Sequence, residues 1–198
     1  MIFKKVIKLR VIAGSAKGRP LKAVPGKNTR PTTDKIKEAI FNIITPYLQE
    51  GLVLDLYAGT GGLGIEALSR GMDKAIFIDQ DKISIEIIKK NLILCDFLEI
   101  SEIYRNDSLR ALNALIKRGL QFDLVFIDPP YKINNYDIVL KILYDNKMIS
   151  RKGIIIVEHD VKISLNDYSD FYTLIKKTSY GNTGISIYQS INRDEGAD

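Results

Sequence analysis

The chain has 198 residues, 27% of them charged, with a formal net charge of +5. This length fits one domain with a full hydrophobic core. The single cysteine, Cys95, excludes an internal disulfide, and with one histidine, His159, the sequence indicates no metal site. No apolar stretch reaches about 18 residues and no signal sequence is evident, so we expect a cytoplasmic protein without a membrane segment. We also expect the protein to be a monomer.

Positive charge is concentrated near the N-terminus. Residues 1–38 hold eleven lysines and arginines against Asp34 and Glu38, a net of 11 − 2 = +9, which leaves 5 − 9 = −4 for residues 39–198. A charge run is most often a solvated face. Here residues 8–11 also alternate polar and apolar, which predicts a hairpin whose basic face binds nucleic-acid phosphates. The candidate RNA contacts are Arg10, Lys17, Arg19, Lys22 and Arg30.

Alternation of strands and helices predicts an α/β protein. Thr32 or Thr33 can cap a first helix that runs to about Leu48, with its apolar face toward the core (Ile36, Ala39, Ile40, Ile43 and Ile44). Strands are predicted near 52–57, 75–79, 100–105, 123–128, 153–158, 171–178 and 184–191, and helices near 63–70, 82–94, 107–118 and 136–146. This order predicts a mostly parallel sheet with an antiparallel terminal pair.

A glycine loop follows the first predicted strand of the sheet. Gly59, Gly61 and Gly64 have the G-x-G-x-x-G spacing that lets backbone approach a cofactor at a helix N-terminus. The next strand ends at Asp79, roughly 20 residues past the loop, where an acid can bind a ribose diol. An ordinary turn with a solvated acid is the alternative interpretation.

Two cofactor classes compete for this loop. A dinucleotide would place a pyrophosphate at the helix N-terminus, and Asp55 would then bring a carboxylate close to that anion. The same carboxylate suits a cationic amino group, which S-adenosyl-L-methionine carries. We expect Tyr57 to line this cofactor site. Asp107, after the third strand, can accept from an adenine amino group or cap the next helix.

The segment Asp128-Pro129-Pro130-Tyr131 follows the apolar run 124–127. Asp128 offers an acceptor, and Pro129 and Pro130 have no N–H, so their backbone offers only carbonyl oxygens. Tyr131 adds an aromatic face on which a base can stack. Together these four residues are typical of a catalytic socket that holds an exocyclic amine for methyl transfer.

The sequence resembles the RsmD-type family of small-subunit (16S) ribosomal RNA guanine-N2 methyltransferases. The matching stretches are residues 10–14, 17–19, 30–34, 37–42, 55–70, 123–131 and 180–183. Asp79 stands where a glutamate is more usual in that family. The resemblance implies a Rossmann-like class I S-adenosylmethionine-dependent fold, methylation of a guanine N2, and 16S rRNA or the assembling small ribosomal subunit as the partner.

Other functions remain open at this stage. An adenine-N6 or other exocyclic-amine methyltransferase that acts on DNA or another RNA shares the Asp-Pro-Pro-Tyr socket. An RNA-binding module would explain only the basic residues, and an NAD-dependent dehydrogenase would explain only the glycine loop. We expect a basic arm over residues 1–31, a methyltransferase domain over 32–191 and a flexible tail over 192–198.

Overall fold

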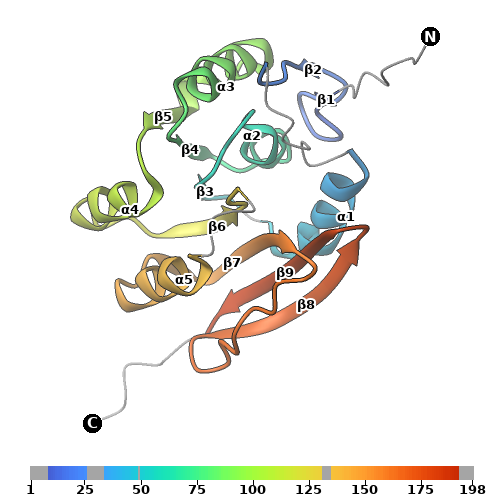
Figure 1. Cartoon of the computed structure of the whole chain (residues 1–198). Coiled ribbons are helices and arrows are strands. Elements are labelled where there is room, and N and C mark those ends of the chain that lie inside the picture. Colours follow the sequence, from blue (N-terminus) through green and yellow to red (C-terminus); the bar gives the residue numbers. More distant parts are fainter. Residues whose placement is uncertain (1–8, 26–33, 49, 131–134, 192–198) are drawn as a thin grey trace.

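The computed structural model describes residues 9–25, 34–48, 50–130 and 135–191. Within these residues, one seven-stranded sheet has the order β5-β4-β3-β6-β7-β9-β8 (Figure 1). Its strands are β3 (Leu52–Asp55), β4 (Lys74–Asp79), β5 (Ser101–Arg105), β6 (Phe122–Ile127), β7 (Ile149–Asp160), β8 (Tyr172–Tyr180) and β9 (Thr183–Ser190). Strands β3 to β7 pair in parallel, and β9 is antiparallel to both β7 and β8. The predicted α/β fold is confirmed.

Helices cover both faces of the sheet. They are α1 (Asp34–Ile44), α2 (Gly62–Ser69), α3 (Lys82–Cys95), α4 (Ser108–Lys117) and α5 (Tyr136–Asp145), with 3-10 turns at η1 (Thr45–Tyr47) and η2 (Leu98–Ile100). Neighbouring strand residues such as Val53 and Leu54 belong to two different core clusters. The first cluster contains apolar residues of α1, α2 and α3, and the second those of α4 and α5, so the molecule has three layers. None of the helices described is long and apolar enough to cross a membrane.

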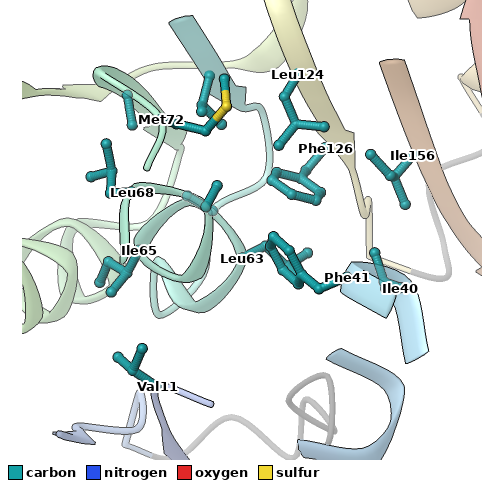
Figure 2. Packing of buried hydrophobic residues seen from close by; sticks show 14 of the residues in the cluster. Val11, Ile40, Phe41, Leu63, Ile65, Leu68, Met72, Leu124, Phe126 and Ile156 are labelled. Carbon is teal, nitrogen blue, oxygen red and sulfur yellow. The ribbon is translucent and has the colours of Figure 1, made fainter. Parts of the chain in front are cut away.

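Helix α1 is shorter than predicted. It ends at Ile44, and the chain continues as the 3-10 turn η1 because Pro46 has no N–H for a further helical bond. Ile40 and Ile44 are buried as expected, but so is Phe41, whose ring lies 5.9 Å from that of Phe126 (Figure 2). The predicted caps, Thr32 and Thr33, lie outside the described residues.

The predicted N-terminal hairpin is present. Strand β1 (Leu9–Arg10) pairs antiparallel with β2 (Pro20–Leu21), next to α2 and α3 (Figure 1). Val11 points toward α2 and belongs to the same core cluster as the helices (Figure 2). The described part of the arm is therefore packed against the rest of the protein. The division at residue 31 stays a prediction, and residues 192–198 lie outside the described part of the chain.

Candidate active site

Acidic side chains gather at one edge of the sheet. Asp55 and Asp79 end β3 and β4, Asp128 follows β6, and Glu158 lies near the end of β7. The four strands are parallel and adjacent, so their carboxyl ends meet at the edge where open α/β sheets bind ligands. Pairing of Ile127 with Val157 makes the next residues, Asp128 and Glu158, neighbours on adjacent strands.

The glycine loop connects β3 to α2 at this edge. Gly59 and Gly61 have φ angles of 55° and 76°, a left-handed backbone that favours glycine. A Cβ on Gly64 would lie 2.4 Å from the Phe77 ring, so this glycine allows α2 to pack on the sheet. A Cβ on Gly59 would meet only the Tyr57 carbonyl oxygen, at 3.9 Å. Space is therefore open beside the loop backbone.

Asp55 is buried beneath the loop. Its Oδ2 accepts a hydrogen bond from the Gly64 N–H at 3.0 Å. The pKa of Asp55 is raised to about 7: burial is the main cause, the Gly64 hydrogen bond opposes it, and the Asp79 carboxylate adds to it. No lysine or arginine in the described part of the chain forms an ion pair with Asp55. A cationic ligand group would supply the missing charge.

Asp79 fastens the loop to β4. Its Oδ2 accepts from the Gly59 N–H at 2.8 Å, and its Oδ1 accepts from the Asp81 N–H at 2.8 Å. A carboxylate has about four lone-pair positions, so Asp79 can also accept from ribose hydroxyls. Its assignment as a ribose contact stays a prediction.

Tyr57 and Asp107 have structural partners of their own. The Tyr57 hydroxyl lies 3.0 Å from both Ser108 Oγ and Asn135 Oδ1, and burial raises the pKa of Tyr57. Asp107 Oδ1 accepts from the N–H groups of Leu109 and Arg110 at 3.1 and 3.2 Å. The expected helix cap at Asp107 is thus confirmed. Cofactor contacts from both residues stay predictions.

Asp128 lies at the start of the predicted amine socket. Burial raises the pKa of Asp128 well above its usual range, and the Glu158 and Asp55 carboxylates raise it further. A raised pKa makes this carboxylate a better proton acceptor. Pro129 is buried and Pro130 is exposed, whereas Tyr131 lies outside the described residues. The catalytic roles of Asp128, Pro129, Pro130 and Tyr131 stay predictions.

His159 lies near the end of β7, as its sequence position indicates. It is buried, with Nδ1 2.9 Å from the Asp160 carbonyl oxygen and Nε2 3.3 Å from Ser186 Oγ. A Cβ on Gly184 would lie 2.4 Å from its ring. These contacts make His159 part of the packing between β7 and β9.

The predicted RNA contacts fall into two groups. Arg10 pairs with Asp34 at 3.0 Å, and Arg19 pairs with Asp96 at 2.7 Å and donates to the Leu94 carbonyl at the end of α3. These arginines are partly neutralised within the protein. Lys17 and Lys22 are exposed, and neither has an ion pair within the described part of the chain. Arg30 lies outside the described residues. All five contacts stay predictions.

Comparisons with known proteins agree with this geometry. The pattern of the family described as "Conserved hypothetical protein 95" matches residues 9–189. YlbH of Bacillus subtilis is 47% identical over 91% of this chain and 98% of its own length. "Ribosomal RNA small subunit methyltransferase D" of Haemophilus influenzae is 34% identical over 92% and 94%. The structure of yhhF from Escherichia coli superposes with a TM-score of 0.81 at 29% identity, covering 92% of this chain and 98% of that one.

The chain belongs to this family. The resemblance found in the sequence is thereby confirmed, since a family relative carries the name that the resemblance implied. The yhhF structure superposes over 92% of this chain, so the predicted Rossmann-like class I architecture is confirmed as well.

Sequence reasoning missed a buried charge network in this family member. Glu66 of α2 is fully buried, and its two oxygens accept from the N–H groups of Ile12 and Ala13 at 2.8 and 2.9 Å. Lys37 and Arg70 complete the network at 3.2 and 2.9 Å from the same carboxylate. Burial lowers the pKa of Lys37, opposed chiefly by Glu66. The signal in the sequence was a charge inside the apolar run 63–68.

Glu158 and Asn91 were also missed. Glu158 directly follows the apolar run 154–157, as Asp128 follows 124–127, and this parallel could have indicated a second acid at the site. Asn91 carried no comparable signal, because one polar residue on a helix is most often solvated. In the structure it is fully buried.

Proposed function

We propose that this chain is an S-adenosyl-L-methionine-dependent methyltransferase that acts on the exocyclic N2 of a guanine in 16S rRNA. The observation that carries the proposal is Asp128, a carboxylate of raised pKa at the end of β6, next to the glycine loop and followed by Pro129 and Pro130. The name of the Haemophilus influenzae relative supports ribosomal RNA as the substrate.

The acids at the sheet edge fit the cofactor. S-adenosylmethionine supplies a sulfonium-activated methyl group and carries an amino group that is cationic at neutral pH. Asp55 is placed to bind that amino group, and Asp79 the ribose. A pyrophosphate at the N-terminus of α2 would meet repulsion from Asp55, which disfavours NAD.

The residues after β6 would hold the acceptor nitrogen. Asp128 and the Pro129 carbonyl oxygen can accept hydrogen bonds from the amino group, which aims its lone pair at the methyl carbon. The cofactor would supply the methyl group there, so that a carbon–nitrogen bond would form as the carbon–sulfur bond breaks and a neutral thioether would leave. Asp128 then takes the surplus N2 proton, directly or through water. Alignment of this kind can supply roughly 7–11 kcal/mol of barrier reduction.

Glu158 favours guanine over adenine. Guanine presents its N1–H next to its amino group, whereas adenine presents a lone pair at N1. A second carboxylate beside Asp128 can accept from guanine N1–H and would repel the adenine N1 lone pair. The relatives' names support ribosomal RNA as the substrate, and this second carboxylate supports guanine over the adenine-N6 alternative.

The basic arm would hold the partner, 16S rRNA or the assembling small subunit. Lys17 and Lys22 are exposed on the described part of this arm and can neutralise phosphates. We further propose a monomer that works in the cytoplasm, where its substrate is assembled.

The proposal is tested by incubating the protein with tritiated S-adenosylmethionine and unmethylated small subunits, then mapping the labelled nucleoside. We expect label in N2-methylguanosine. Asp128→Ala should abolish transfer while leaving the affinity for S-adenosylhomocysteine nearly unchanged, because the amine socket holds the acceptor amine and not the cofactor. Label in N6-methyladenosine would overturn the guanine assignment, and near-normal turnover by Asp128→Ala would overturn the catalytic one.

A further inference from the structure

Asn91 connects two segments that are far apart in the sequence. It lies in α3 and is fully buried. Its Oδ1 accepts from the Lys22 N–H at 2.7 Å, and its Nδ2 donates to the carbonyl oxygens of Thr60 and Lys22 at 2.9 and 3.1 Å. The amide therefore bonds the arm and the glycine loop at once.

The bond to Thr60 falls at the most adaptable part of the loop. Thr60 lies between Gly59 and Gly61, whose left-handed backbone leaves little steric restraint. The Gly59 N–H is held by Asp79 on the other side. The Asn91 amide thus fixes the peptide group that leads into α2, and with it the loop backbone facing the cofactor site.

The arm is also attached to the helix that follows the loop. Ile12 and Ala13 donate to Glu66, and the Ser15 N–H donates to the Ser69 carbonyl oxygen at 2.8 Å. Both Glu66 and Ser69 belong to α2. A displacement of the arm would therefore be transmitted to the glycine loop by two routes. One runs through α2, and the other through Asn91 of α3.

We propose that Asn91 is a positioning residue that couples the basic arm to the glycine loop, so that RNA held by the arm and cofactor held by the loop strengthen each other's binding. This inference rests on the proposed function, because it takes RNA as the arm's ligand and S-adenosylmethionine as the loop's. Coupling of two sites is reciprocal, so each ligand changes the affinity of the other by one common factor.

The test measures S-adenosylhomocysteine affinity by calorimetry with and without saturating unmethylated 16S rRNA. For the wild type we expect RNA to raise the affinity about fivefold or more. Asn91→Ala should bring this factor close to one. Asn91→Asp, which keeps an acceptor for the Lys22 N–H but loses the donor to Thr60, should do the same and serves if the alanine variant does not fold.

Leu92→Ala is the matched control, because it empties the neighbouring buried position of the same helix and leaves the three Asn91 hydrogen bonds in place. It should lower the melting temperature yet keep the coupling factor. A wild-type factor of one, or a factor that survives in both Asn91 variants, would overturn the coupling while methyl transfer stays intact. If Leu92→Ala also lost the coupling, general packing of α3 would explain the effect of the Asn91 variants, and the proposed role of the Asn91 hydrogen bonds would be overturned. Absence of methyl transfer by the wild type would instead refute the proposed function.

Discussion

At the residue scale, Asp55 shows how burial prepares a group for a ligand. Its carboxyl group has a pKa of about 7, so it carries a proton in about half of the molecules at neutral pH. An arriving ammonium group favours the ionised form and lowers this pKa. Cofactor binding should therefore release a proton from the protein.

This gives a pH dependence of defined sign. S-adenosylhomocysteine affinity should rise with pH up to about 7 and fall tenfold per unit below it, because the protonated Asp55 must first lose its proton. At higher pH the ligand amino group loses its own charge, and affinity should fall again. Calorimetry in buffers of different ionisation enthalpy measures both limbs. An Asp55→Asn variant that keeps the acid limb would contradict the assignment.

Glu158 offers a second test at the same scale. Its carboxylate helps to raise the pKa of Asp128, and Asp128 must be ionised to accept a proton. The rate at saturating cofactor should fall as pH decreases through this raised pKa. Glu158→Gln removes the neighbouring charge, so the acid limb should move to lower pH. An unmoved limb in a pH–rate profile would show that another group controls it.

At the scale of elements, Glu66 holds the hairpin and α1 to α2. Its carboxylate accepts from two backbone N–H groups of the arm and pairs with Lys37 and Arg70. Gly14 belongs to the same junction, since a Cβ there would lie 1.7 Å from the Ser69 carbonyl oxygen. Through α2, these contacts bring together the separate stretches 10–14 and 37–42.

Removal of the central carboxylate should be costly. Glu66→Ala leaves the buried Lys37 ammonium without its counter-charge and the two N–H groups without their acceptor, and we expect a loss of about 3–5 kcal/mol in the free energy of unfolding. Glu66→Gln should cost less because it keeps an acceptor. Urea denaturation measures the change, and exposed Glu86→Ala, within about 0.5 kcal/mol of wild type, is the control. Equal stability of Glu66→Ala and wild type would refute this role of the network.

At the scale of the whole molecule, charge separates the two binding surfaces. Carboxylates line the edge of the sheet, whereas exposed lysines lie on the arm. Under the proposed function, this separation would draw a cationic cofactor and a polyanionic RNA to different places. The formal +9 of residues 1–38 overstates the free charge, because Arg19 and Lys37 are paired with Asp96 and Glu66, which lie outside this range.

RNA affinity should therefore depend on particular lysines. Binding should weaken steeply with salt, and Lys17→Ala or Lys22→Ala should each flatten the logarithmic slope by about one unit. Arg19→Ala should change the slope less and lower the melting temperature instead, because Arg19 contacts Asp96 and the end of α3. Filter-binding titrations at several salt concentrations measure the slopes. Unchanged slopes in both lysine variants would show that Lys17 and Lys22 are solvated and do not contact RNA phosphates.

The sequence by itself determined the order of strands and helices, the glycine loop and the acids at the strand ends. These features depend on local periodicity and on residues next to one another, such as Asp128 after its apolar run. Boundaries were less certain: β7 extends from Ile149 to Asp160 because β6 and β9 provide pairing partners over that length.

Only the tertiary structure decided which charges are buried and which residues meet. Glu66 contacts the arm across 53 and 54 residues, and Asn91 contacts Lys22 across 69. Glu158 becomes a neighbour of Asp128 through strand register alone. Local patterns constrain neither distant pairing nor burial of a polar side chain, because both arise when separate elements pack and must satisfy each other's hydrogen bonds.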